Sequence, residues 1–195
     1  LQNVFIRTKE KQRRNQPVKK LKPIYTCSNQ HPNWQDRVIE WWNDWAINGY
    51  AHKKKQLYLW GKADTGKTYF INHLLKIAVD HGSENIEDQD VIDKQVFRPQ
   101  PNEPRFAWQR FQTNSFNIML IDEYYDGEFN LGEIKKVLAG ETLTANVKGQ
   151  EPKEIRIQIP TIIISNFAPA NVQINPLLAG IRERLTVVTA NKKFY

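Results

Sequence analysis

The residues of this chain that are best suited to chemistry form a glycine-rich stretch, residues 61–68. The stretch has the pattern G-x-x-x-x-G-K-T, and its members are Gly61, Lys62, Ala63, Asp64, Thr65, Gly66, Lys67 and Thr68. Such a loop between a strand and a helix turns backbone N–H groups toward one point, where they and the positive helix end hold a phosphate chain. Lys67 would reach the β- and γ-phosphates of ATP, and the Thr68 hydroxyl would bind Mg²⁺.

The segments on either side of this stretch have the types that the pattern needs. Residues 56–60 read Q-L-Y-L-W, which is typical of a buried strand. Apolar side chains recur at helical spacing over residues 67–79, and they are Phe70, Ile71, Leu74, Leu75 and Ala78. A chance match in a glycine turn is the alternative. Because the strand, the helix and the Lys-Thr pair occur together, the sequence favours a phosphate-binding loop.

An acidic pair follows a second apolar run. Residues 116–121 read F-N-I-M-L-I and predict another buried strand, after which come Asp122 and Glu123. In P-loop enzymes a carboxylate at this place binds Mg²⁺, and we expect this of Asp122. Glu123 could then orient or deprotonate the attacking water.

A third apolar run, residues 161–165, predicts a strand that ends at Asn166. Ligands bind outside the carboxyl ends of the strands in an open α/β sheet. We therefore expect three strands to bring Lys67, the Asp122–Glu123 pair and Asn166 to one crevice. The Asn166 amide could hydrogen-bond the γ-phosphate or the water. The alternative is an asparagine that only forms a turn after its strand.

Capping residues predict two further helices. Asn33 precedes an apolar stripe that stops before Gly49, and the stripe consists of Trp34, Val38, Trp41, Trp42 and Trp45. An aromatic stripe can stack on bases, but its helical spacing favours a place in the core. Asn130 and Glu133 form a capping pair for a short helix that Gly140 ends.

Two neighbouring runs of alternating residues predict a β-hairpin. Each run has three apolar residues on one face, namely Leu143, Ala145 and Val147, then Ile155, Ile157 and Ile159. Residues 148–153 lie between the runs, which places Lys148 at the tip and Lys153 on the far side of the same turn. Both lysines are candidate contacts for the phosphate backbone of a nucleic acid. The alternative is that they are ordinary exposed lysines of a turn.

The net charge of +7 lies entirely in residues 1–22. This arm carries eight Lys or Arg and one acid, whereas the rest of the chain carries 20 basic and 20 acidic side chains. Such an arm is either a nucleic-acid or nuclear-import segment or a solvated linker. Residues 80–104, in contrast, are rich in acids and prolines, and we expect them to form exposed segments.

The size and cysteine content of the chain limit the classes to which it can belong. A chain of 195 residues is expected to hold one α/β domain and a small accessory element. Cys27 is its only cysteine, which excludes an intrachain disulfide and suits a reducing compartment, the nucleus or cytoplasm of a host. No signal peptide is visible, and the apolar runs are too short to span a membrane.

The order of these motifs resembles that of the superfamily 3 helicase domain. This domain occurs in replication initiator (Rep) proteins of small single-stranded-DNA viruses and related plasmids. Residues 61–68 are similar to its Walker A motif, and Asp122-Glu123 to its Walker B motif. Residues 138–149 resemble its B′ segment, and residues 160–166 resemble its motif C.

The resemblance covers roughly residues 34–190 and implies an α/β P-loop NTPase core of AAA+ type, with a central, mainly parallel sheet flanked by helices. It also implies a homo-oligomeric ring, usually a hexamer, which binds ATP between subunits and moves on single-stranded DNA. Residues 181–188 resemble the segment that places an arginine in the ATP site of a neighbouring subunit. Arg184 fits this role best and Arg182 is the second choice. The alternative is an exposed Arg-Glu-Arg helix end.

A rolling-circle nuclease often precedes this domain in the family, and we expect such a domain upstream in a longer protein. We predict a basic arm at residues 1–30, a helical element at 31–50 and the ATPase domain at 51–195. The expected function is ATP-driven unwinding of DNA during Rep-initiated replication of a virus or plasmid. Two alternatives stay open, a superfamily 3 RNA helicase of an RNA virus and a nucleic-acid-binding module that uses nucleotide as an assembly switch. Glu123 favours hydrolysis over a passive switch.

Overall fold

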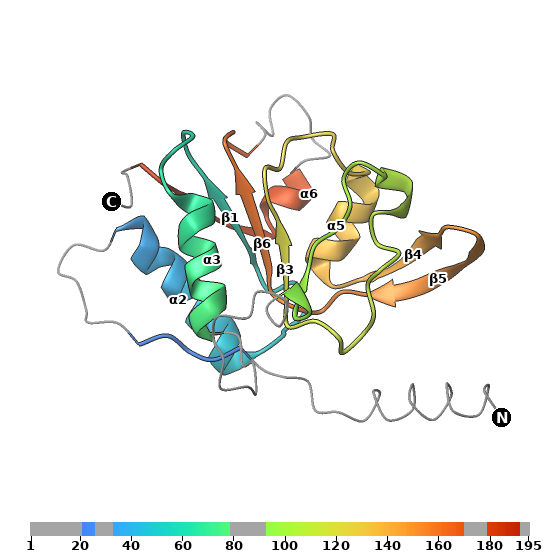
Figure 1. The fold of residues 1–195 in the computed structure, drawn as a ribbon, viewed down its shortest axis with the longest axis horizontal. Helices are drawn as coiled ribbons and strands as arrows, with labels where there is room; N and C mark the ends of the chain where they lie inside the picture. Colours follow the sequence, from blue (N-terminus) through green and yellow to red (C-terminus); the bar gives the residue numbers. More distant parts are fainter. Residues whose placement is uncertain (1–20, 26–32, 79–92, 170–178, 192–195) are drawn as a thin grey trace.

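A parallel sheet with helices on both faces forms the centre of the molecule in the computed structural model (Figure 1). The structure describes residues 21–25, 33–78, 93–169 and 179–191. In these residues five parallel strands pair in the order β2-β3-β6-β1-β7. The strands are β1 (Gln56–Trp60), β2 (Val96–Phe97), β3 (Ile118–Ile121), β6 (Thr161–Ser165) and β7 (Leu185–Thr189). The expectation of a central parallel sheet is therefore confirmed, and the short strand β2 is an addition that its two residues were too few to predict.

The first face of the sheet is covered by α2 (Trp34–Asn48) and α3 (Lys67–Ala78). Asn33 and Asp36 form a reciprocal capping box at the start of α2, and Gly49 ends it with a positive φ. The aromatic stripe of α2 is buried, so the core interpretation is confirmed. Its indole N–H groups also find acceptors, because Trp41 and Trp45 donate to the Lys55 carbonyl and Trp42 donates to the Lys22 carbonyl.

The second face is covered by α5 (Leu131–Ala139) and α6 (Ala179–Arg182). The Asn130 side chain accepts hydrogen bonds from two backbone N–H groups of the first turn of α5, as predicted. Glu133 differs from the expected capping pair, because its carboxylate accepts from the Trp108 indole N–H at 2.8 Å instead of returning to the cap. Gly140 ends α5 in the left-handed conformation, with φ 67°.

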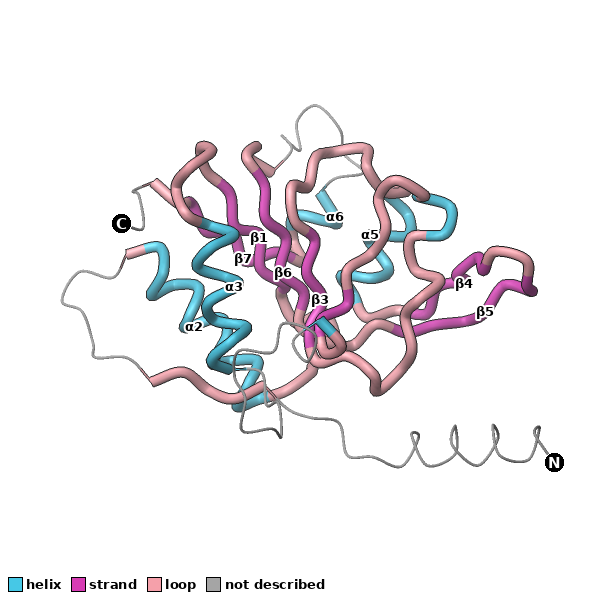
Figure 2. Tube along the Cα trace, viewed as in Figure 1, coloured by secondary structure: helices cyan, strands magenta, loops and turns pink. Residues whose placement is uncertain are grey.

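The predicted hairpin consists of β4 (Thr142–Val147) and β5 (Gln150–Arg156), which project from the end of the sheet (Figure 2). Val147 pairs with Gln150, so only Lys148 and Gly149 form the turn. The expectation that residues 148–153 form one turn is therefore wrong. Most of the polar strand β5 pairs with β4, with an irregularity between Ala145 and Val147, and this pairing decides the turn because β5 has no apolar alternation that would predict it.

The segment between β2 and β3 is more structured than we expected. It contains the 3₁₀ turn η1 (Pro104–Phe106), and after that turn Trp108 and Phe111 are buried in the hydrophobic core between α5 and the second face of the sheet. Phe111 packs edge-on against Phe97 with ring centroids 5.2 Å apart. Residues 79–92, which hold most of the expected acidic loop, and residues 1–20 of the basic arm lie outside the described part. Among the described helices none is long and apolar enough to span a membrane.

Candidate nucleotide-binding site

The glycine-rich loop follows β1 directly and leads into α3, as its pattern predicts. Gly61 donates its N–H to the Ser165 carbonyl of β6 at 3.3 Å, and its backbone lies so close to Ala190 that a side chain at Gly61 would collide with the Ala190 carbonyl. Gly66 has a φ of 84°, and Asp64 also has a positive φ, of 60°. Only glycine adopts such conformations readily, although Asp and Asn tolerate them better than other residues do. These backbone angles fold the loop into the concave shape that a phosphate chain needs.

Lys67 is the centre of this loop and is only 6% exposed. Its Nζ donates to the carbonyls of Gly61 and Lys62 at 2.9 and 2.8 Å and to the Asn166 Oδ1 at 3.1 Å. Burial lowers the pKa of the Lys67 ammonium, while the nearby charges of Asp122 and Asp64 act in the opposite direction. A cation that is already desolvated and oriented is well prepared to meet an anion.

The second charged part of the site is the contact between Thr68 and Asp122. The Thr68 hydroxyl donates to Asp122 Oδ1 at 3.2 Å, although the two residues come from α3 and from the end of β3. Asp122 Oδ1 also accepts the Glu123 N–H at 2.9 Å, which helps to hold Glu123 at a positive φ of 57°. A non-glycine residue in this conformation stores strain, and such strain occurs often at functional sites.

A hydroxyl and a carboxylate oxygen in contact fit the ligands of Mg²⁺, which binds proteins through one or two oxygens and completes its shell with phosphates and water. Thr68 and Asp122 are therefore the residues that would hold this ion. Among the described residues no cluster of three or more His, Cys, Asp or Glu side chains could hold a metal by itself.

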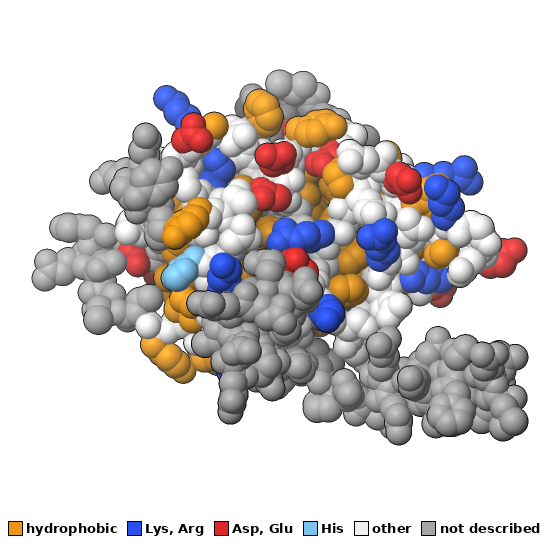
Figure 3. All heavy atoms as spheres, viewed as in Figure 1, with side chains coloured by type: hydrophobic (Ala, Val, Ile, Leu, Met, Phe, Trp, Pro, Cys, Tyr) orange, Lys and Arg blue, Asp and Glu red, His pale blue; other side chains and the backbone are white. Residues whose placement is uncertain are grey.

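These residues line one pocket with a volume of about 380 Å³ at the carboxyl ends of β1, β3 and β6. The lining includes Lys67, Thr68, Asp122, Glu123 and Asn166, so the structure brings together all the side chains that we expected in one crevice. Figure 3 shows acidic side chains gathered over this edge of the sheet. The pocket volume lies in the range of small-molecule sites.

The sequence did not reveal the residues that fix the two loops at this edge. Ser165 donates its hydroxyl to the Tyr124 carbonyl at 2.7 Å and accepts from the Phe167 N–H at 3.0 Å. Tyr58 donates its hydroxyl to the Phe167 carbonyl at 3.1 Å. Burial raises the pKa of Tyr58 and Tyr124 above the ordinary value, so both hydroxyls stay protonated in alkaline solution as well as at neutral pH. These bonds tie Asn166 to the loop after Asp122. The only signal for them was the polar Ser165 at the end of an apolar strand.

No protein-family model and no curated protein sequence matches the chain. Among solved structures, the NrS-1 C-terminal region matches with a TM-score of 0.52 and 16% identity over 90% of this chain and 41% of that chain. The JCV helicase matches with a TM-score of 0.47 and 13% identity over 83% of this chain and 42% of that chain. The chain thus spans less than half the length of either.

The chain has the α/β P-loop NTPase fold. The sheet order agrees with this fold, and so do the loop after β1 and the polar residues after β3 and β6. At these identities the likeness concerns the fold alone.

The two arginines proposed for a neighbouring site lie at the other end of the P-loop NTPase sheet. Arg184 comes just before β7, and its carbonyl accepts from the Gln56 N–H at the start of β1. The loop with Lys67 follows the far end of the same strand, which leaves about 16 Å between them at roughly 3.3 Å per residue. Arg184 therefore cannot reach Lys67 of its own chain. Arg182 is exposed, whereas Arg184 is half-buried.

The two candidate lysines of the hairpin have different surroundings. Lys148 lies in the turn, its side chain is 74% exposed, and its ammonium is 4.0 Å from the Glu103 carboxylate. Lys153 lies within β5 opposite Ala145, and its Nζ donates to the Phe111 carbonyl at 2.9 Å. Burial lowers the pKa of the Lys153 ammonium. Lys148 is therefore presented to solvent, and Lys153 joins the hairpin to the segment before β3.

Proposed function

We propose that this chain is an ATP-driven helicase or translocase of the superfamily 3 type, which unwinds DNA in replication started by a Rep-type initiator. One observation carries the enzymatic part of the proposal. Two hydrogen bonds connect the elements around one pocket. Lys67, at the start of α3, donates to Asn166 after β6, and Thr68 donates to Asp122 after β3. A passive nucleotide switch would need the phosphate loop and the Mg²⁺ carboxylate Asp122, but it would not need Glu123 to activate a water.

In this proposal Lys67 binds the β- and γ-phosphate oxygens of ATP. The same ammonium now donates to two backbone carbonyls and to Asn166. Because it is buried, its attraction for the phosphates is screened less than it would be in water. Positive charge fixed in this position stabilises the negative charge that moves to the leaving β-phosphate oxygen.

Thr68 and Asp122 would hold Mg²⁺ against the phosphates, and the ion would neutralise charge on the transferred group. Asp122 also accepts from the Glu123 N–H, so the metal-binding carboxylate and the neighbouring backbone are held together. This contact fixes the position from which the Glu123 side chain enters the pocket.

Glu123 would orient the attacking water and take its proton. The water oxygen forms a bond to the γ-phosphorus as the bond from that phosphorus to the bridging oxygen breaks, which gives ADP and phosphate. Asn166 would hydrogen-bond the γ-phosphate or the water, and it would exchange its present contact with Lys67 for this one. A group that acts mainly in the transition state raises the rate more than the affinity.

Assembly of several copies is part of the proposal, since Arg184 lies about a strand length from its own P-loop. In a ring, Arg184 would enter the ATP site of the next copy. The exposed Lys148 at the tip of the hairpin would contact the phosphate backbone of single-stranded DNA, and such contacts depend strongly on salt. Lys153, also a nucleic-acid candidate, would act indirectly by holding the hairpin in place.

The test is the rate of ATP hydrolysis by the wild-type chain alone, with single-stranded DNA and with RNA of the same length. Glu123→Gln is the matched control, because it keeps size and polarity but cannot accept a proton as a carboxylate does. We expect stimulation by DNA above that by RNA, and little turnover by Glu123→Gln in either case. Equal stimulation by RNA would favour the RNA helicase, and binding of ATP without turnover by the wild type would favour the assembly switch.

A further inference from the structure

One buried hydroxyl connects the two loops that carry Glu123 and Asn166. Ser165 is the last residue of β6 and is only 1% exposed. Its hydroxyl donates to the Tyr124 carbonyl at 2.7 Å and accepts from the Phe167 N–H at 3.0 Å. Glu123 directly precedes Tyr124, and Asn166 directly precedes Phe167. The Ser165 hydroxyl therefore contacts the backbone next to each of these two side chains.

Backbone hydrogen bonds attach the same part of β6 to its neighbours. The Tyr124 N–H donates to the Ile164 carbonyl at 2.8 Å, so both polar backbone groups of Tyr124 are bonded to β6. The Ser165 carbonyl accepts from the Gly61 N–H at 3.3 Å, at the start of the glycine-rich loop. The end of β6 thus contacts the phosphate-binding loop on one side and the chain after Glu123 on the other.

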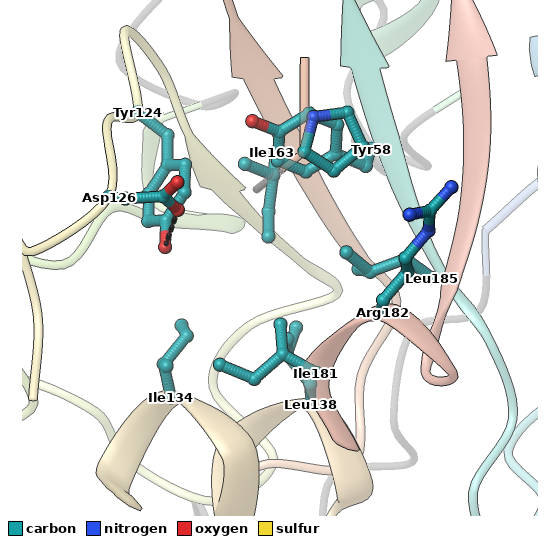
Figure 4. A pocket seen from close by; sticks show the side chains of 10 residues that line it. Tyr58, Tyr124, Asp126, Ile134, Leu138, Ile163, Ile181, Arg182 and Leu185 are labelled. Atoms are coloured by element: carbon teal, nitrogen blue, oxygen red, sulfur yellow. Dashed lines mark hydrogen bonds between the residues drawn. The ribbon is translucent and has the colours of Figure 1, made fainter. Parts of the chain in front are cut away.

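Tyr58 of β1 holds the loop after β6 at a second point. Its hydroxyl donates to the Phe167 carbonyl at 3.1 Å, so the N–H and the carbonyl of Phe167 are both bonded. The Tyr58 ring packs edge-on against Tyr124, with ring centroids 6.1 Å apart. Figure 4 shows the two tyrosines on one side of a small pocket of about 20 Å³, opposite Ile134 and Ile181 of the helices α5 and α6. The tyrosine pair thus supports, from the second face of the sheet, the loops that Ser165 joins.

The spacing of these two loops matters for the proposed reaction. Glu123 would orient the attacking water and Asn166 would contact the γ-phosphate or the water, so the two side chains must stand at a fixed separation. A displacement of about 1 Å can lower a rate about 10²-fold. Without the Ser165 hydroxyl, the Tyr124 carbonyl and the Phe167 N–H would lose this partner, which costs stability for buried polar groups. The loops would then relax away from the spacing that the hydroxyl imposes.

We propose that Ser165 is a positioning residue, whose hydroxyl sets the separation between Glu123 and Asn166 during ATP hydrolysis. The Tyr58 hydroxyl supports it from the second face of the sheet. The inference rests on the function proposed above and goes beyond it, because the Ser165 hydroxyl acts on backbone groups and not on the nucleotide. Its loss should lower kcat and leave ADP affinity nearly unchanged, since the Ser165 carbonyl still accepts from Gly61 and the P-loop is intact.

Ser165→Ala tests the proposal, with Thr161→Val as the matched control. Thr161 is the first residue of β6 and is fully buried, so Thr161→Val also removes a buried hydroxyl from this strand, but at the end away from the site. We expect Ser165→Ala to lower kcat about 10- to 100-fold, while the Kd for ADP by calorimetry changes less than about threefold. Thr161→Val should hydrolyse ATP like the wild type.

Two further variants separate the hydrogen bonds from the packing. Ser165→Cys fills the same place but bonds weakly, so its kcat should lie near that of Ser165→Ala. Tyr58→Phe keeps the ring and should lower kcat less than Ser165→Ala, because Tyr58 bonds only one of the two loops. A wild-type kcat in Ser165→Ala or Ser165→Cys, or equal losses of kcat and ADP affinity, would overturn the proposal.

Amide hydrogen exchange tests the contact without reference to turnover. The Phe167 N–H donates to the Ser165 hydroxyl, so its exchange should be faster in Ser165→Ala and unchanged in Thr161→Val. An exchange rate at Phe167 that matches the wild type in Ser165→Ala would show that the hydroxyl does not hold the loop.

A double-mutant cycle shows through which side chain Ser165 acts. If Ser165 positions Asn166, the loss of kcat in the double variant Ser165→Ala with Asn166→Ala should be clearly smaller than the product of the two single losses. Losses that multiply would mean that Ser165 acts independently of Asn166, contrary to the proposal. A wild type that does not hydrolyse ATP would contradict the proposed function itself, whereas normal wild-type turnover with an unchanged kcat in Ser165→Ala would overturn this inference alone.

Discussion

The positively charged side chains at the two ends of the parallel sheet have different surroundings. At the carboxyl end, Lys67 is buried and donates to two carbonyls and an amide oxygen, and Asp122 lies close enough to attract it. At the amino end, Lys135 and Arg184 lie over Gly180 with no carboxylate within ion-pair distance among the described residues. The buried ammonium at the carboxyl end is hydrogen-bonded without a ligand, whereas the Arg184 Nε at the amino end has no hydrogen-bond partner.

This difference indicates which parts of the site a single chain can complete. Short strands and tight loops bring Lys67, Thr68, Asp122 and Asn166 together without any partner molecule. The basic pair at the amino end has no carboxylate within ion-pair distance among the described residues. The following changes test this contrast in order of decreasing expected effect.

The largest effect is expected at the carboxyl end. Lys67→Ala removes the buried cation and should abolish ATP turnover, because the transition state loses its charge neutralisation. Asp122→Ala should do the same by removing the carboxylate that would hold Mg²⁺. Steady-state phosphate release measures both. Turnover within tenfold of the wild type in either variant would show that the chemistry lies elsewhere.

Asn166→Ala should have a smaller effect that falls on rate more than on affinity. The amide would contact the γ-phosphate or the water, so we expect turnover to fall about 10- to 100-fold while ADP affinity changes little. Single-turnover kinetics and ADP titration measure the two quantities. If ADP affinity fell as much as the rate, the contact between Asn166 and Lys67 would only support the loop.

The hairpin offers a second contrast, between Lys148 in the turn and Lys153 within β5. Lys148→Ala should weaken single-stranded DNA binding at all sequences and lower the salt slope by about one unit per subunit engaged, with basal ATPase unchanged. Lys153→Ala should instead lower the melting temperature, because the Phe111 carbonyl loses its donor. An unchanged DNA affinity in Lys148→Ala would make Lys148 an ordinary turn lysine.

The smallest effect concerns a pH-dependent ion pair outside both sites, between Asp44 of α2 and Lys54. Hydrogen bonds from Lys54 and Asn48 lower the pKa of Asp44 below its ordinary value of 3.8. The charged carboxylate therefore stabilises the fold at pH values above 3.8. This contribution to stability disappears as the pH falls through the lowered pKa. Because the Asp44 side chain is 52% exposed, Asp44→Asn should cost only about 0.2–1 kcal/mol at pH 7. Thermal unfolding should show no difference at pH values below the lowered pKa.

Local patterns predicted the carboxyl end of the sheet well. The glycine stretch follows one apolar run, and Asp122 and Asn166 follow two others. The sequence therefore predicts where each strand ends and which polar side chain lies at that end. Parallel pairing of β1, β3 and β6 then follows from their burial on both faces. Asn33 and Gly140 were also sufficient to place one helix start and one helix end.

Features that depend on contacts distant in sequence were not predictable in the same way. β2 has two residues, and only pairing with β3 makes it a strand. Trp108 is buried against residues distant in sequence, since its ring packs on Phe129 and its N–H donates to Glu133, 25 residues later. The meeting of Lys135 and Arg184 over Gly180 likewise requires the packing of α5 against α6, which no periodicity in either segment reveals.

Mixing two inactive variants tests most directly whether the two ends of the sheet form one site between copies. Arg184→Ala should bind ATP normally and lose most of its turnover, since an arginine supplied by a neighbour is worth about 10³–10⁵ in rate in other P-loop enzymes. Lys67→Ala has an intact Arg184 and no working P-loop. Combining the two should restore part of the ATPase activity, because some interfaces then join an intact P-loop to an intact Arg184. No recovery, with subunit exchange shown by labelled chains, would contradict a site shared between copies.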